Sequence, residues 1–318
     1  MNRSEYHVAN MLFTYTIIFI CFISFFGLSG ILGKIFGGSD YLFGVAFAQV
    51  EFLIPVVIYL AFCRKKLPTF SHLSAGQEIR SRIGLKAVSP LKPLVAVVAG
   101  FAIIPFLSFF SQLSLVGVKD VTTENAQAAA ASHPFILMFF IVAVIPPFIE
   151  ESLFRGIYFG TYSRAGLVPG ICLSSLLFGL MHGNFNQFVY AFIAGLVFSA
   201  FVAASGSILV TFIMHLIVNG TSIFAFYAEK FGISMPDFFL VPHHDSVSQV
   251  FKYYFLPAFL GAIVLLICAL ILVKSGRKNS EIKVPEKSKI WNFEGIFDLV
   301  LIVGIAIMVL NMIATELM

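Results

Sequence analysis

The chain has 318 residues, of which 59% are apolar, 15% aromatic and 11% charged, and its formal net charge is +4. Soluble globular domains are nearer a quarter charged, so this composition disfavours a cytosolic enzyme, a disordered chain and a secreted disulfide scaffold. The small positive excess also gives no reason to expect a nucleic-acid partner. What remains is an all-α, polytopic transmembrane helical bundle, because backbone polar groups in lipid must be satisfied within helices.

The apolar segments of the chain recur at the length of a membrane helix, roughly 20 residues. The predicted spans are residues 9–32, 41–62, 93–116, 134–163, 167–183, 186–204, 207–227, 253–273 and 292–314. The segment 167–183 is short enough to cross only partly, so we expect eight or nine membrane helices. Polar loops are expected at 117–133 and 228–252.

Two loops rich in Lys and Arg, residues 64–92 and 274–291, decide the expected orientation. Alternating nine spans from a cytoplasmic N-terminus puts both loops on the cytoplasmic side, as the positive-inside rule requires. We divide the chain into N-terminal helices with the first basic loop (1–92), a core that carries three polar motifs (93–230) and C-terminal helices (231–318).

The first motif is Glu150-Glu151-Ser-Leu-Phe-Arg155, inside the fourth predicted span. Glu151 and Arg155 are four residues apart on one helix face, in the favourable order for an ion pair. Glu150 points about 100° away round the helix and is free to face another partner. Pro146-Pro147, one turn upstream, is expected to kink or break the helix and admit water beside Glu150. A purely structural ion pair is the alternative.

The other two motifs place a histidine in each of two later spans. They are Phe178-Gly-Leu-Met-His182 and His215-Leu-Ile-Val-Asn219. Counting residues from the two predicted hairpin turns puts Glu150 about 22 Å, His182 about 25 Å, His215 about 14 Å and Asn219 about 20 Å deep. The four groups are therefore predicted to meet at one level inside the bundle, although His and Asn in membrane helices also serve as interhelical glue.

These residue types suit hydrolysis in a water-filled pocket. A carboxylate and an imidazole can activate a water, while a second imidazole and an amide can donate hydrogen bonds to an oxyanion. Alternatively, Glu150, His182 and His215 bind a zinc ion with water in the open position. Because Asn219 is a poor zinc ligand, we favour the version without a metal.

The three motifs, in this order on successive helices, resemble the CPBP family of intramembrane endopeptidases, also called Abi or CAAX-protease-and-bacteriocin-processing proteins. The resemblance covers roughly residues 134–222. It implies that Glu150 and His182 activate the water, that His215 and Asn219 stabilise the oxyanion, and that Glu151 and Arg155 support the site. Phe178 opens the second motif and has a supporting role. The implied fold is a helical bundle with a cavity that opens to one side of the membrane and to lipid.

The resemblance also implies the partners and the location. The substrate would be a hydrophobic peptide or protein in contact with lipid, prenylated (CAAX-type) or bacteriocin-like, at the plasma membrane of a prokaryote. Two other classes stay open: a non-catalytic immunity or partner-binding protein on the same fold, and a proton-coupled transporter.

Overall fold

The computed structural model describes residues 3–25, 41–63, 83–118, 121–236, 246–278 and 293–317. This part of the chain folds into helices and their connections, without a strand. Most of the two basic loops (64–82 and 279–292) and the end of the first predicted span (26–32) lie outside the described residues.

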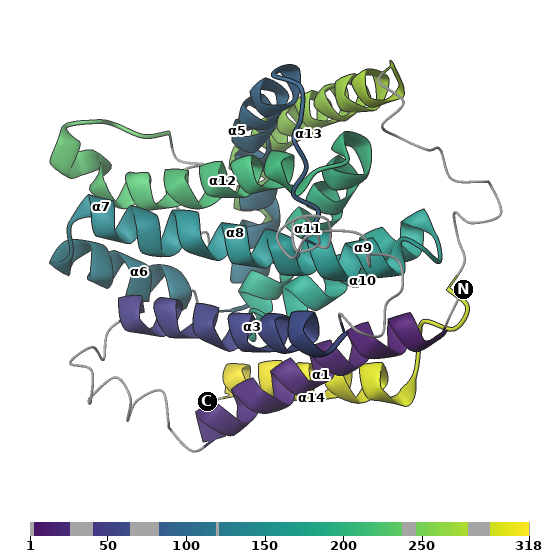
Figure 1. Ribbon diagram of the computed structural model, residues 1–318. Helices are drawn as coiled ribbons and strands as arrows, with labels where there is room; N and C mark the ends of the chain where they lie inside the picture. The colour runs from purple at the N-terminus through teal and green to yellow at the C-terminus, as the bar shows by residue number, and fades with distance from the viewer. Residues whose placement is uncertain are drawn as a thin grey trace.

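Long helices make up most of the structure (Figure 1). They are α1 (Arg3–Phe25), α3 (Tyr41–Cys63), α5 (Leu91–Leu115), α6 (Val121–Ser132), α10 (Leu167–Leu180), α11 (Phe185–Ser205), α12 (Ile208–Ala228), α13 (Val247–Lys278) and α14 (Leu299–Leu317). Between α6 and α10 lies a composite helix built from α7 (Phe135–Met138), η2 (Phe139–Val144), α8 (Ile145–Glu151), η3 (Ser152–Tyr158) and α9 (Phe159–Tyr162). A short 3₁₀ turn, η4 (Glu229–Phe231), follows α12.

The length and composition of these helices confirm a polytopic helical membrane protein. Seven of the described helices are long and apolar enough to cross a bilayer. Two shorter apolar helices, Tyr41–Ile54 and Leu167–Leu180, cover the other two predicted spans. At 14 residues, α10 extends about 21 Å, which is less than the hydrocarbon core of a bilayer. Many apolar side chains of α13 and α14 face outward, as expected of helices in contact with lipid.

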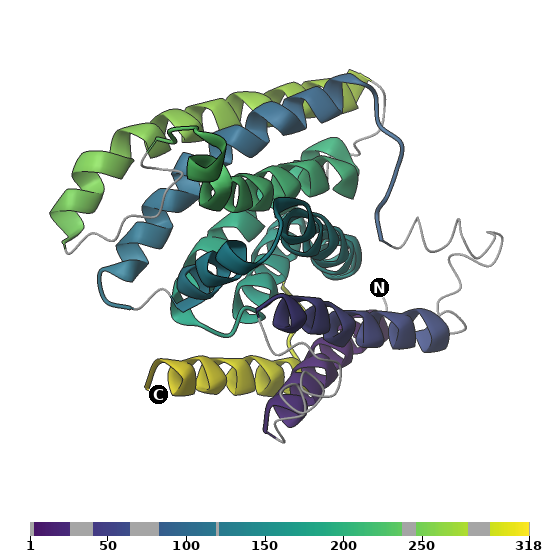
Figure 2. The ribbon, with the colours of Figure 1, turned by 90° about the vertical axis from the view of Figure 1, so that its left-hand side faces the viewer.

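The helices form three layers, seen most clearly in Figure 2. Helices α5 and α13 pack side by side on one face, and α1, α3 and α14 cover the opposite face. The composite helix lies with α10, α11 and α12 between these two layers. The motif-bearing helices are therefore shielded on both faces.

Helices α1 and α14 run side by side in the same direction. Asn10 Nδ2 donates to the carbonyl of Ile296 at 2.7 Å, and Thr14 Oγ1 donates to the carbonyl of Val300 at 2.7 Å. The first and last helices therefore enter the bundle from the same side. An odd number of crossings requires this arrangement, which agrees with the predicted alternation of nine spans.

The segment 117–133, expected to be a loop, contains helix α6. Its sequence Ala-Gln-Ala-Ala-Ala-Ala has high helix propensity, although it is too weakly apolar to be recognised as a membrane span. Ala129 and Ala130 are buried against α12 and the composite helix. Helix α13 also begins earlier than expected, at Val247 rather than residue 253.

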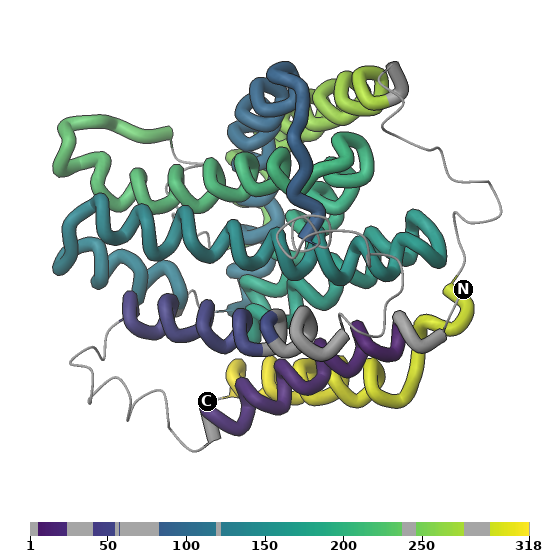
Figure 3. The backbone as a smooth tube through the Cα atoms, in the orientation of Figure 1, coloured from purple at the N-terminus to yellow at the C-terminus, as the bar shows by residue number. Residues whose placement is uncertain are grey.

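The composite helix does not break at Pro146-Pro147, and its path is continuous in Figure 3. Instead, π-helical turns lie on both sides of α8, at Phe139–Val144 and Ser152–Tyr158. A π turn adds a residue to the helix, which changes the directions of the side chains that follow, and such turns are frequent at functional sites.

Candidate active site

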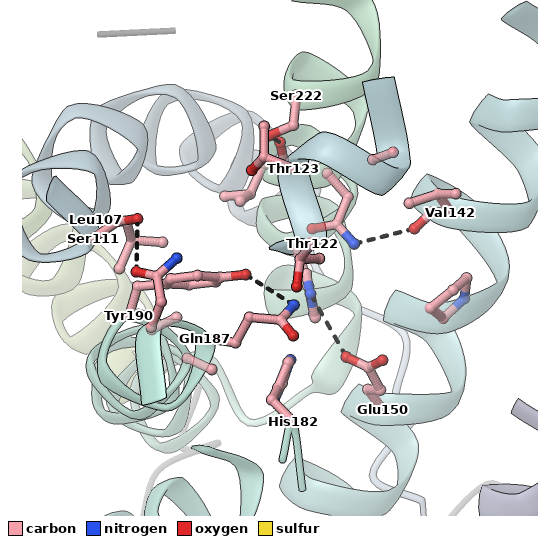
Figure 4. A pocket seen from close by; sticks show the side chains of 18 of the residues that line it. Leu107, Ser111, Thr122, Thr123, Val142, Glu150, His182, Gln187, Tyr190 and Ser222 are labelled. Atoms are coloured by element: carbon pink, nitrogen blue, oxygen red, sulfur yellow. Dashed lines mark hydrogen bonds and ion pairs between the residues drawn. The ribbon is translucent and has the colours of Figure 1, made fainter. Parts of the chain in front are cut away.

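A cavity of about 570 Å³ lies between the layers of the bundle. Residues of α3, α5, α6, the composite helix, α10, α11 and α12 contribute to its wall. Glu150, His182, His215 and Asn219 all line it. Figure 4 shows the Glu150 and His182 side chains facing this cavity from two sides. The expected meeting of four groups from three separate motifs is thus found in the structure.

The two adjacent glutamates contact opposite nitrogens of one histidine. Glu151 Oε1 lies 3.1 Å from His215 Nδ1, and Glu150 Oε2 lies 3.8 Å from His215 Nε2. Because a carboxylate accepts, His215 Nδ1 carries the proton of the first contact. The second contact is longer than a hydrogen bond, so the carboxylate of Glu150 and Nε2 are both able to bind a water in the cavity.

Arg155 lies behind this pair and is completely buried. Its Nη1 is 3.3 Å from Glu151 Oε1, which confirms the expected ion pair between residues four apart. The guanidinium lies over the ring of Phe178 at 4.1 Å and that of Phe198 at 5.2 Å. Aromatic faces attract a desolvated cation, so these two rings replace the water that Arg155 has lost.

His182 follows directly after α10, in the turn that ends the helix. Its Nδ1 is 2.9 Å from the carbonyl of Phe178. A carbonyl only accepts, so Nδ1 is protonated and Nε2 keeps its lone pair. The Phe178 ring meets the His182 ring edge to face, with centroids 5.0 Å apart. Phe178 therefore orients His182 through both its backbone and its side chain.

Asn219 lies one turn after His215 on α12. Its side-chain amide donates to the carbonyl of Val142 at 3.1 Å (Figure 4). In an α-helix that carbonyl accepts from residue 146, and in a π-helix from residue 147. Both positions are prolines without an N–H, so Asn219 supplies the missing donor. The amide has a second proton that is available to another acceptor.

The geometry also bears on the zinc alternative. Among the described residues, no three His, Cys, Asp or Glu side chains are arranged to hold a metal ion. Both nitrogens of His215 already face carboxylates. The zinc alternative therefore stays a prediction of the sequence, and the arrangement of the described residues suits the binding of a water between a carboxylate and imidazoles.

Several residues of the site carried no signal in the sequence. Phe198 is one of 38 phenylalanines, so its position beside Arg155 could not be recognised. The described residues that α3, α5 and α6 contribute to the cavity wall include no acidic, basic or histidine side chain. The Val142 carbonyl could have been found, because Pro146 has no N–H to donate to the carbonyl four residues before it in a helix.

Comparison with known proteins agrees with this site. Residues 132–221 match the family model described as type II CAAX prenyl endopeptidase Rce1-like. The membrane-embedded CAAX protease MroQ of Staphylococcus aureus (strain USA300) is 24% identical over 189 aligned positions, and the match covers 55% of this chain and 76% of that protein. YdiL of Bacillus subtilis (strain 168) is 27% identical over 130 aligned positions, and the match covers 38% of this chain and about half (52%) of that protein. No solved structure matches the chain significantly.

The matched residues contain all three motifs and the four cavity-lining groups. The fold and the matches together describe a polytopic helical membrane protein that is similar to intramembrane proteases. More specifically, residues 132–221 are similar to the Rce1-like domain of type II CAAX prenyl endopeptidases, in agreement with the resemblance seen in the motifs.

Proposed function

We propose that the protein hydrolyses a peptide bond within a hydrophobic peptide, using a water activated by Glu150 and His182. The observation that carries this proposal is the convergence of Glu150, His182, His215 and Asn219 on one cavity inside a membrane bundle. Ser152, the hydroxyl residue of the first motif, donates to the carbonyl of Phe148 at 2.7 Å and does not line the cavity, so the proposed attacking group is water.

Each residue has a defined task in this mechanism. Glu150 takes a proton from the water as its oxygen attacks the carbonyl carbon, and then returns that proton to the leaving nitrogen. The free Nε2 of His182 accepts the water's other hydrogen and fixes its orientation. The carboxylate of Glu151 stabilises the imidazolium form of His215, in which Nε2 donates to the oxyanion. The second amide proton of Asn219 completes the oxyanion site.

The substrate proposal rests on the walls of the cavity and on the relatives. Apolar side chains such as Phe52, Leu107 and Phe198 line the space beside the polar groups, which suits a hydrophobic or lipid-modified chain. MroQ is named a CAAX protease, so a prenylated peptide is one candidate and a bacteriocin-like peptide is another. Both relatives are bacterial, which supports a prokaryotic plasma membrane, and the two basic loops support a cytoplasmic N-terminus.

Reconstituted wild-type protein should cleave members of a library of hydrophobic and prenylated peptides, with mass spectrometry showing the addition of one water at an internal bond. We expect Glu150→Gln to lower kcat at least about a hundredfold, because it removes the general base. Glu51→Gln is the matched control, since Glu51 is a buried acid of α3 that does not line the cavity.

Binding of peptides without any cleavage by the wild type would favour the non-catalytic interpretation. Cleavage that persists in Glu150→Gln would contradict the proposed base.

A further inference from the structure

Two glutamines in the cavity wall have buried side-chain oxygens that lack a hydrogen-bond partner. Gln49 lies on α3 and is 6% exposed, and Gln112 lies on α5 and is 1% exposed. The Oε1 atom of each is among the buried unpartnered atoms of the described residues. A buried acceptor without a donor costs free energy, so these two amides need a donor that the described residues do not supply.

The side-chain oxygens of two other amides in the cavity wall, Gln187 and Asn186, do have partners. Gln187 Oε1 accepts from Asn184, and its Nε2 donates to Tyr190 at 3.1 Å. Asn186 Oδ1 accepts from Ser111 at 3.3 Å (Figure 4). Among the amide side chains of the described cavity wall, the buried oxygens without a partner are those of Gln49 and Gln112.

Both glutamines belong to a wall that lies outside the matched domain, residues 132–221. The residues that α3, α5 and α6 contribute to the cavity are neutral, and Ser111, Thr122 and Thr123 add hydroxyl groups to this wall. A terminal carboxylate is best held by Arg or Lys, and this part of the described cavity wall offers neither. The chemistry that fits is a neutral N–H donor.

We propose that Gln49 and Gln112 form a subsite that accepts hydrogen bonds from main-chain N–H groups of an uncharged stretch of peptide. This inference rests on the proposed function, because it treats the ligand as the substrate whose scissile carbonyl lies at Glu150. The matched domain supplies the reacting groups, and helices α3 and α5 align the substrate backbone. Selection at this subsite depends on the presence of N–H groups rather than on particular side chains.

The test measures binding of a fluorescent, N-acetylated and C-amidated octapeptide of Leu and Ala to the Glu150→Gln protein in detergent. Gln49→Leu and Gln112→Leu in that background should each raise Kd about threefold to tenfold, as expected for one lost hydrogen bond. Gln127→Leu is the matched control, because Gln127 is exposed on α6 and lies outside the cavity. It should leave Kd unchanged.

Two further readouts separate binding from structure. N-methylation at one amide removes one N–H donor of the peptide. It should raise Kd for the protein that has both glutamines. It should leave Kd unchanged for the variant in which Leu replaces the glutamine that accepts from that N–H. The Tm of each Leu variant should equal or exceed that of its parent, because an unpartnered buried acceptor has been removed. A merely structural role predicts a lower Tm and unchanged Kd.

The subsite is overturned if the Leu variants bind as tightly as their parent, if N-methylation has no effect at any position, or if the octapeptide does not bind. Hydrolysis is measured separately with Glu150 intact. If the wild type cleaves peptides but the Leu variants bind the octapeptide as tightly as their parent, the proposed function stands and the subsite is rejected. If the Leu variants bind the octapeptide more weakly than their parent but the wild type cleaves no peptide, the subsite stands and the hydrolysis is rejected.

Discussion

The carbonyl of Val142 gives Asn219 a structural task beside its proposed catalytic one. Pro146-Pro147 deprives this carbonyl of both helical donors, and Asn219 supplies the replacement. Asn219→Leu should therefore leave a partly buried acceptor unpaired and lower the free energy of unfolding by about 1 kcal/mol. Thermal unfolding in detergent measures this loss.

A second substitution separates the two tasks of Asn219. Pro146→Ala restores an N–H four residues after Val142, so it should recover stability in the Asn219→Leu background. It should not recover the rate of cleavage, because the oxyanion donor is still missing. Recovery of both stability and rate would show that Asn219 acts only through the helix.

Glu151 and Arg155 form a buried ion pair whose members depend on each other. Arg155→Met leaves Glu151 as an uncompensated buried charge and should destabilise the fold by about 3–5 kcal/mol. The double variant Glu151→Gln/Arg155→Met removes both charges and should regain most of this stability. Its cleavage rate should stay low, because His215 has lost the carboxylate at 3.1 Å that orients it.

Unfolding and cleavage assays on the wild type, Arg155→Met and the double variant check this prediction. A double variant as unstable as Arg155→Met would contradict the charge argument and favour packing of Arg155 on Phe178 and Phe198 as the main stabilising effect.

Among the helices, α10 and α11 set the positions of His182 and Phe198, and their close approach depends on Gly195. A Cβ at Gly195 would lie 2.9 Å from the Cα of Ser175, which is too close for an unshifted backbone. Gly195→Ala should therefore separate these helices and cost about 1–3 kcal/mol, with a fall in activity. Gly160→Ala is the control, because open space surrounds that position and alanine favours helix.

A Tm for Gly195→Ala equal to or above that of Gly160→Ala would contradict this account of the interface. Full activity of Gly195→Ala together with a lower Tm would also contradict it, because the spacing of α10 and α11 would then not determine the geometry of the site.

The helices with strong apolar periods could be predicted from the sequence, and their bounds mostly fall within a few residues of the observed ones. Helix α6 could not, because its alanines carry little hydropathy and its burial depends on α12. The π turns around α8 were also unforeseen. Pro-Pro indicates lost hydrogen bonds, but only the tertiary partner Asn219 explains why the helix continues instead of breaking.

For the molecule as a whole, the motifs predicted which catalytic candidates meet, because residue spacing fixes depth along each helix. They could not predict the opposite wall of the cavity. Gln49 and Gln112 lie in predominantly apolar helices, where a single glutamine forms no recognisable motif. Their place in the cavity wall follows only from the packing of α3 and α5 against the core. The division at residues 92 and 230 stays a prediction, and the cavity draws residues from both sides of the first boundary.

The measurement that tests the account most directly is a cycle of cleavage rates for wild type, Glu150→Gln, His182→Ala and the double variant in proteoliposomes. If both residues activate one water, each single change should lower kcat about a hundredfold or more. The double variant should be little slower than the slower single variant, because groups that act as a unit are not additive. Losses that multiply in the double variant, or a wild-type rate in either single variant, would contradict a shared catalytic water.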